Sequence, residues 1–391
     1  MPSIRIATFN LEELDEQPTA ATGPAVVAGA PAGVAGAPAG VAGAPAAVAG
    51  APAAVAVAAA STVKPSRKPT LQERKRIMVP QLERIGADIL CLQEVHAQRS
   101  KGQPFELRAL DDLIKGTYLE NFHRAHTKDA QGEPNAFRNL VVLSRYRILE
   151  QELIDERQRR PLYKPVTATK DDGTPLDGEA EPIFWERPIL RVKVDLGKNG
   201  ELHLFNVHMK SKIPKSIKGQ IVNPNARYKV FKTASAWAEG LFISSMERLG
   251  QAVEARIAID KIFNAADGQK DKDPLIAICG DFNAENDEIP LKALCAPTEE
   301  IANKALLNRI MIPCERNVPE SSRYSLFHMG HGEMIDHILV SRGMFGLFRG
   351  TEIHNEALPD ESGPFRSDDQ FPESDHAPVV AKFEVPFELP K

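Results

Sequence analysis

The sequence predicts an α/β fold in which two β-sheets pack face to face, with helices outside them. Short apolar segments with the two-residue alternation of strands recur along the whole chain. Few segments between them have helical spacing, and strands and helices do not alternate strictly. Many strands with few intervening helices favour a sandwich over a single parallel sheet.

The elements follow in a definite order. The first strand is expected at residues 4–9, and a helix follows at 71–85, where Thr70 and Glu73 form a capping box and Pro80 is expected to kink or split the helix. The longest helical pattern covers residues 234–263. Further strands are expected at residues 87–92, 139–143, 188–194, 202–207, 275–279, 337–340 and 379–383.

One stretch departs from ordinary globular composition. At about residues 18–69 the chain is dominated by Ala, Gly, Val and Pro, with a proline every seven residues from Pro24 to Pro52. Repeated proline excludes a coiled coil despite the seven-residue period, and it argues against a membrane span. We expect residues 1–391 to form one domain, interrupted by this flexible low-complexity insertion.

Composition limits the possible partners and location. The 391 residues carry a formal net charge of -5, so an anionic partner must be held by a local basic patch or by a metal. The four cysteines include no CxxC pair, and Cys91 and Cys279 lie in apolar segments typical of buried, reduced thiols. No secretion signal or transmembrane segment is recognised, so we expect a cytoplasmic monomer.

Polar residues stand at the ends of these strands. Alone, the Asp and Asn residues are ordinary turn residues, the Glu is typical of a solvated strand end and the His residues of structural positions, and the segment GDFNA at 280–284 is as typical of a turn as of a ligand cluster. Their repetition at separate strands predicts that they gather at one place, with the composition of a hydrolytic metal site. The residues are Asn10, Glu94, His208, Asp281, Asn283, Asp336, His337, Asp375 and His376.

These motifs together resemble one family. The segments TFN, LQEV, NVHMKSK, GDFNA, IDHILVS and SDHAPV, in this order, are similar to those of the endonuclease/exonuclease/phosphatase superfamily. The resemblance covers the whole chain apart from the insertion. It implies a four-layer α/β sandwich and phosphoester hydrolysis that depends on Mg²⁺, for which Mn²⁺ can substitute.

The resemblance also implies roles for the residues. Glu94 is expected as the principal metal ligand beside Asn10, with Asp375 as a second ligand or a neighbouring carboxylate. Asp281 is expected to orient or activate the attacking water and Asn283 to donate to a phosphate oxygen, because alternate residues of an extended segment face the same way.

Two histidines complete the expected catalytic set. Asp336 would fix the tautomer of His376, while His208 would act on the other side of the phosphate, as an acid towards the leaving oxygen or as a hydrogen-bond donor. Which group acts as the base stays open.

Substrate binding is predicted next to the motif NVHMKSK. Asn206, Lys210, Lys212 and Arg187 are expected to bind substrate phosphate, although Arg187 is equally typical of a surface cation. Residues 210–232 are rich in Lys and contain no acid, with Tyr228, Phe231 and Trp237 as possible stacking faces. This pattern favours a nuclease acting on DNA or RNA. The alternatives are a phosphatase, a phospholipid-head-group phosphodiesterase or an inactive binding protein.

Overall fold

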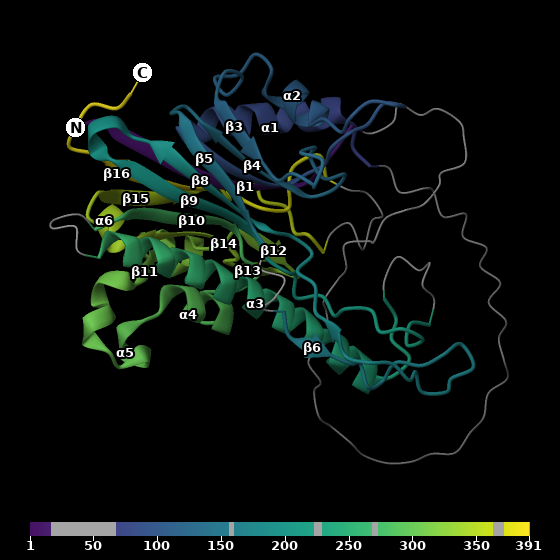
Figure 1. Ribbon diagram of the computed structural model, residues 1–391. Helices are drawn as coiled ribbons and strands as arrows, with labels where there is room; N and C mark the ends of the chain where they lie inside the picture. Colours follow the sequence, from purple (N-terminus) through teal and green to yellow (C-terminus); the bar gives the residue numbers. More distant parts are fainter. Residues whose placement is uncertain (17–67, 156–159, 223–228, 268–272, 363–370, 391) are drawn as a thin grey trace, which may run out of the picture.

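Two six-stranded sheets form the centre of the protein (Figure 1). The computed structural model describes residues 1–16, 68–155, 160–222, 229–267, 273–362 and 371–390. The insertion expected at about 18–69 therefore lies almost wholly outside the described residues.

Each sheet combines parallel and antiparallel strands. The first sheet has the order β15 (Phe348–Ile353), β16 (Val379–Glu384), β1 (Ser3–Leu14), β2 (Ile89–Val95), β4 (Asn139–Ser144) and β3 (His123–His126). The second has the order β11 (Met311–Pro313), β14 (Asp336–Ser341), β10 (Leu275–Asp281), β9 (Glu201–His208), β8 (Ile189–Asp195) and β5 (Ile148–Ile154). Among these neighbours only the pairs β1 with β2 and β9 with β10 are parallel.

Helices cover the outer face of each sheet. Helices α1 (Leu71–Ile85) and α2 (Arg108–Ile114) bury Met78, Leu82 and Leu110 against the first sheet. Helices α3 (Ala234–Ala266) and α4 (Ile289–Cys295) cover the second sheet. The order helix, sheet, sheet, helix confirms the predicted α/β sandwich and its layers (Figure 1).

The core between the sheets changes character towards one end. In β1, Ile4 and Ile6 belong to the apolar core, and Thr8 and Asn10 continue the same row of side chains because residues two apart face the same way. All four are buried. In β2, β9 and β10 the corresponding rows carry Gln93, Asn206, His208 and Asp281. The inner layer is therefore apolar over most of its length and polar at one edge.

Buried amides join the two sheets just beneath this polar edge. Nε2 of Gln93 donates to Thr8 at 3.1 Å and to Oδ1 of Asn206 at 2.7 Å. Nδ2 of Asn206 donates to the carbonyl oxygens of Leu92 and Val141. The amide groups of Gln93 and Asn206 thus have partners in both sheets, which fixes the position of one sheet against the other.

The boundaries correct several predictions. The capping box at Thr70 is confirmed, but α1 continues through Pro80, so the expected split of this helix is wrong. β5 and β15 were not expected from the sequence, because these strands are half-exposed and rich in polar residues. Strand β1 also extends five residues beyond the predicted end at Phe9, to Leu14.

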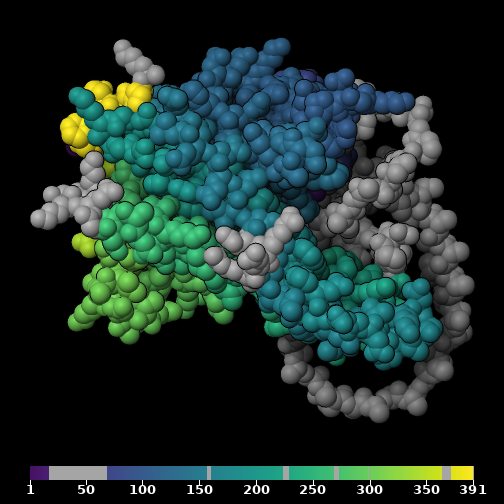
Figure 2. Space-filling model, viewed as in Figure 1, coloured from purple at the N-terminus to yellow at the C-terminus, as the bar shows by residue number. Residues whose placement is uncertain are grey.

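A side lobe stands beside the sandwich, built from residues 160–187, 209–222 and 229–250 (Figures 1 and 2). It has its own small apolar cluster around Trp185, Ile217 and Ile243. The first half of α3 runs into the lobe, while its second half covers the second sheet. No helix in the described part of the chain is both long and apolar enough to span a bilayer.

Gly280 in β10 tests how tightly the second sheet is packed beneath the polar edge. An added Cβ would overlap the carbonyl oxygen of Val207 and lie 2.8 Å from its carbonyl carbon, on a backbone with φ of +144°. We expect Gly280→Ala to lower the free energy of unfolding by about 2–6 kcal/mol, measured by urea denaturation.

The matched control is Gly116→Ala. Gly116 has a φ of +77° but no atom within 4 Å of an added Cβ, so only backbone strain of about 1–2 kcal/mol is expected. Equal losses in both variants would contradict the tight packing at Gly280.

Candidate active site

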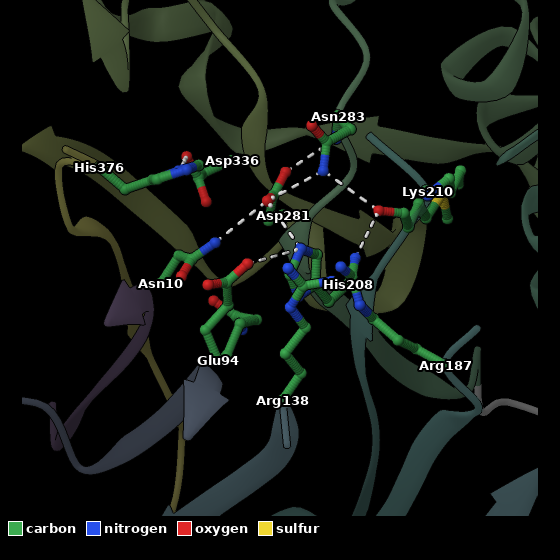
Figure 3. Close-up of polar contacts among 12 residues, drawn as sticks. Asn10, Glu94, Arg138, Arg187, His208, Lys210, Asp281, Asn283, Asp336 and His376 are labelled. Atoms are coloured by element: carbon green, nitrogen blue, oxygen red, sulfur yellow. Dashed lines mark hydrogen bonds and ion pairs between the residues drawn. The ribbon is translucent and has the colours of Figure 1, made fainter. Parts of the chain in front are cut away.

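The strand order brings the polar ends of separate strands to one edge of the sandwich (Figure 3). β1 and β2 run parallel, as do β9 and β10, so Asn10, Glu94, His208 and Asp281 lie at carboxyl ends that meet. β14 and β16 run antiparallel to their neighbours, so Asp336 and His376 reach the same edge from amino ends. This edge is separate from a cavity of about 1170 Å³ between α3 and the strands β8 and β9, which none of these side chains lines.

Three side chains converge on the carboxylate of Asp281. Nδ2 of Asn10 donates to Oδ2 at 3.1 Å and Nδ2 of Asn283 at 3.0 Å, while Nε2 of His208 lies 3.3 Å from the same oxygen. Burial, followed by the negative charge of Asp336, raises the pKa of Asp281 to about 7. A carboxylate with such a pKa is suited to exchange a proton near neutral pH.

Asn283 reaches Asp281 through a turn. Its φ is +48°, and its backbone N–H donates to Oδ1 of Asp281 at 2.8 Å. The expectation of an extended segment after Asp281 is therefore wrong, although the two side chains do meet. The amide nitrogen of Asn283 also donates to the carbonyl oxygen of Met209, so in this structure it orients Asp281.

Asp336 and His376 form a close pair. Nδ1 of His376 lies 2.7 Å from Oδ2 of Asp336, whose backbone N–H donates to Oγ of Ser325. Burial alone would lower the pKa of His376, but the charge and hydrogen bond of Asp336 outweigh it and raise that pKa well above its usual range. Nε2 of His376 lies 3.9 Å from Oδ1 of Asp375, beyond hydrogen-bond distance, so it can still contact a water or a phosphoryl oxygen.

A group of carboxylates lies on the other side of His376. Oε2 of Glu94 accepts from the backbone of Glu13 at 3.1 Å, and Oε2 of Glu12 accepts from the backbone of Asp375 at 3.2 Å. Burial, followed by the charge of Asp375, raises the pKa of Glu12 well above its usual range. Burial also raises the pKa of Asp375. The positive charge of His376 opposes this rise, and the negative charge of Glu94 adds to it.

These carboxylates fit a divalent cation. Among the described residues, Oδ1 of Asp375 and Oδ1 of Asp336 are buried without a hydrogen-bond partner. Buried acids that repel one another and keep unpartnered oxygens are stabilised by a hard cation, which prefers oxygen ligands. The predicted ligands Glu94, Asn10 and Asp375 all lie at this edge.

A second arrangement could also hold a cation. Ligand atoms of Asp281, Asp336 and His376 lie within 4.8 Å of one another. His376 already shares one ring nitrogen with Asp336, and Asp281 Oδ2 already accepts two hydrogen bonds. Such a set of donors and acceptors is better suited to moving a proton than to holding an all-oxygen metal site.

Two arginines, Arg187 and Arg138, lie close to His208 (Figure 3). Arg187 is buried and donates to the carbonyl oxygen of Met209 at 3.1 Å, and Arg138 rises from the start of β4 towards His208. Burial, followed by the charges of Arg187 and Arg138, lowers the pKa of His208 well below its usual range. His208 is therefore neutral at pH 7 and suited to donate a hydrogen bond.

The other predicted phosphate ligands are placed differently. Asn206 is fully buried with its amide bonded between the sheets, so its predicted contact with substrate is wrong. Lys210 forms an ion pair with Glu186 at 2.9 Å, and Lys212 pairs with Glu288 and Glu333. Both lysines lie beside the site with their ammonium groups already paired.

Sequence reasoning missed Glu12 and Arg138. Arg138 directly precedes the strand predicted at residues 139–143. Asp336 was selected because it directly precedes a predicted strand, and the same criterion would have selected Arg138. Five residues other than glycine at this edge have φ values in the left-handed region, and such strain gathers at functional sites. They are Glu12, Glu13, Glu94, Arg138 and Asn283.

A buried ion pair supports the loop that carries Asn283. Nδ1 of His337 lies 2.6 Å from Oε1 of Glu315, and its Nε2 lies 2.8 Å from the carbonyl oxygen of Ala284. Burial opposes charge on His337, but the carboxylate of Glu315 raises its pKa. His337, which sequence reasoning placed at the strand end, holds this loop from below rather than facing the site.

Comparison with known proteins agrees with the motifs. The model of the Endonuclease/Exonuclease/phosphatase family matches residues 59–376. No curated protein matches the chain. The chain therefore belongs to the endonuclease/exonuclease/phosphatase family, whose members are hydrolytic phosphoesterases.

Solved structures with a similar fold share little sequence. A humanized D. rerio TDP2 is 13% identical, with 98% of this chain and 99% of that chain covered and a TM-score of 0.47. A family protein from Bacteroides thetaiotaomicron is 14% identical, with coverage of 98% and 96% and a TM-score of 0.47. The 3′ phosphatase NExo from Neisseria, bound to a product DNA hairpin, is 16% identical, with coverage of 79% and 95% and a TM-score of 0.41.

Arg138 offers a test that separates function from stability. Its φ is +55°, and among the described residues its only ion pair is with Glu13 at 3.6 Å. Glycine relieves the backbone strain, so we expect Arg138→Gly to keep or raise the free energy of unfolding by up to about 1 kcal/mol. Hydrolysis of a phosphodiester should fall about 100-fold, since a cation near the reacting phosphate is lost.

Arg145→Gly is the control, because Arg145 has no left-handed φ and pairs with Asp88 at 2.8 Å. It should lose stability and keep activity. A variant Arg138→Gly that is destabilised yet fully active would show that Arg138 serves the fold.

Proposed function

We propose that the protein is a Mg²⁺-dependent phosphodiester hydrolase, and specifically a nuclease that cleaves DNA or RNA. The observation that carries this proposal is the convergence on Asp281 of Asn10, Asn283 and His208, with the pair Asp336–His376 within 4.8 Å of it. Membership of a phosphoesterase family supports the reaction class.

The side chains can divide the work of an in-line displacement. Asp281, oriented by two amides, accepts the proton of the attacking water. His376 donates from Nε2 to a phosphoryl oxygen, because Asp336 keeps its ring charged. His208, held neutral, donates a hydrogen bond on the side of the leaving oxygen.

Glu94, Asn10 and Asp375 are the residues that would hold Mg²⁺. When bound there, the cation would neutralise charge on the phosphate and on the surrounding carboxylates. Arg138 and Arg187 add positive charge next to His208 (Figure 3). Two guanidinium groups beside a metal suit a substrate that presents phosphates, which they can bind in a bidentate manner.

The nucleic acid assignment depends on the chain next to the site. Residues 210–232 leave β9 directly after His208 and contain no Asp or Glu. A basic segment that begins at the reacting centre is suited to a polyanionic substrate. The charge of this segment supports a nuclease over an enzyme for a small phosphate ester.

The metal site can be located by thermal unfolding. Mg²⁺ should raise the melting temperature of the wild type, because a ligand that binds only the folded state stabilises it. We expect Glu94→Gln to raise the melting temperature without metal, since one repelling charge is removed, and to abolish the response to Mg²⁺.

Asp336→Asn separates the two candidate arrangements. It should keep the response to Mg²⁺ if the ion binds at Glu94, and lose it if the ion binds among Asp281, Asp336 and His376. The control Glu150→Gln, on the exposed strand β5, should behave as the wild type. A full response to Mg²⁺ in Glu94→Gln would overturn the assignment of Glu94.

Catalysis is tested by a panel of substrates. Purified protein should cleave single- or double-stranded DNA or RNA with Mg²⁺ or Mn²⁺ and lose all activity in EDTA. Asp281→Asn and His376→Ala should each lower the rate about 10²- to 10⁴-fold while remaining folded. Lys198→Ala, on an exposed turn outside the site, is the control.

Sphingomyelin and an inositol phosphate belong in the same panel. Faster hydrolysis of either than of any nucleic acid would contradict the nuclease assignment and keep the reaction class. Full activity in both variants, or in EDTA, would contradict the reaction itself.

A further inference from the structure

Large apolar side chains are exposed on the side lobe. Most of the described chain exposes such side chains singly, which is normal for a protein surface, but here they gather in one region. They are Leu162, Val166, Phe184, Val222, Val230, Trp237 and Phe242, each at least 45% exposed. A concentration of this kind marks a surface that contacts another molecule.

One hollow on this surface combines aromatic rings with ammonium groups. It has a volume of about 410 Å³, and we call it the Trp237 hollow. Trp237 in the first turn of α3 is 45% exposed, and Phe231 lies beside it. The hollow is lined by Lys229, Val230, Phe231, Lys232, Thr233, Ala234 and Trp237.

Basic residues from the described parts of segment 210–232 lie between the active site and this hollow. After His208 the chain runs back along α3, where Lys210 donates to Gln251, Ile213 accepts from Ser244 and Lys215 donates to Gly240. The last of these contacts is close, because a Cβ at Gly240 would overlap the carbonyl oxygen of Lys215. The path from Gln251 to Thr233 spans 18 helical residues, or about 27 Å.

The lysines along this path are paired with carboxylates near the active site, while those at the hollow form no ion pair within the described residues. Near the active site Lys210, Lys212 and Lys215 pair with Glu186, Glu288, Glu333 and Glu247. Lys232, at the hollow, pairs with no carboxylate of the described residues, and Lys229 donates to the carbonyl oxygen of Pro214. Burial, followed by the neighbouring charge of Lys210, lowers the pKa of Lys229, so an anion there would relieve repulsion between cations.

We propose that the Trp237 hollow is a second binding site for the single-stranded part of a nucleic acid substrate, displaced along α3 from the active site. A base stacks on Trp237, and an adjoining phosphate contacts Lys232, while Lys229 adds positive charge on the side towards Lys210. Aromatic faces with cations in a groove bind single strands in this way without reading sequence. The inference rests on the proposed nuclease function, because it concerns how that substrate is held.

The separation of the two sites makes binding depend on length. A stacked strand advances about 3.4 Å per nucleotide, so about eight nucleotides match the length of α3 between Gln251 and Thr233. A strand of 20 nucleotides can occupy both sites, while one of four nucleotides occupies only one of them. The hollow should therefore matter for long substrates and be without effect on small ones.

Tryptophan fluorescence reports on the hollow directly. The chain has two tryptophans, and Trp185 is only 8% exposed while Trp237 faces solvent. Adding a 20-nucleotide single strand in EDTA, which prevents cleavage, should quench the emission of the wild type. Trp237→Phe should lose this quenching and bind within about threefold of the wild type, because a phenyl ring still stacks.

Trp237→Ala is the decisive variant, measured by fluorescence anisotropy with the labelled 20-nucleotide strand. Its affinity should fall about 5- to 150-fold, because the stacking of one base is lost.

Lys232→Ala should reduce the slope of log K against log salt by about 0.7, because one phosphate contact is lost. Hydrolysis of a chromogenic phosphodiester should stay unchanged in both variants, which shows that they fold. Phe387→Ala, an exposed ring near the C-terminus, is the matched control and should bind as the wild type.

The outcomes separate this inference from the proposed function. Unchanged affinity of Trp237→Ala for the long strand would overturn the second site, even if the protein is a nuclease. A wild type that hydrolyses no phosphodiester would contradict the proposed function, while the binding assay would still decide the hollow. A wild-type dimer in sedimentation that Trp237→Ala dissociates, with equal binding of the strand, would assign the surface to a second copy of the chain and overturn the proposal.

Discussion

The alternation of side chains along the strands is the constraint on which the site depends. Residues two apart in a strand face the same side of the sheet. In β1 the row of side chains that begins with Ile4 and Ile6 therefore continues between the sheets as Thr8 and Asn10. Polar groups are costly there unless they are bonded. The amides of Gln93 and Asn206 satisfy one another across the sheets, and beyond them the acids and imidazoles reach the open edge.

Charge at this edge falls into an acidic and a basic group. Glu12, Glu94 and Asp375 repel one another, while burial and the charges of Arg187 and Arg138 keep His208 neutral. Asp281 lies beside His208 and accepts hydrogen bonds from the side-chain amides of Asn10 and Asn283. Such an arrangement costs stability in the isolated chain, and a bound cation and a phosphate would each relieve part of that cost. Strained backbones at five residues of the same edge add to the cost.

The sequence predicted the layers and the gathering of the site, because apolar strand segments and the polar residues after them are local signals. Glu94, His208, Asp281 and His376 could be predicted to meet once the strand order was implied by the family resemblance. Asn206 was misplaced because inward and outward faces near a strand end are set by register rather than by motif. The turn at Asn283 and the place of Arg138 before a strand were local signals that were given less weight than the family resemblance. The ion pairs of Lys210 and Lys212 arise from contacts between distant segments, which no local pattern contains.

The central claim is that a divalent ion binds beside Glu94 and Asn10 at the edge where the strand ends meet. The most direct test is a crystal soaked with Mn²⁺ and measured at the manganese absorption edge, where anomalous scattering locates the ion without assumptions about its ligands. An anomalous peak within coordination distance of the Glu94 carboxylate is expected. A peak held by Asp281, Asp336 and His376 instead, or no peak at this edge of the sandwich, would contradict the account.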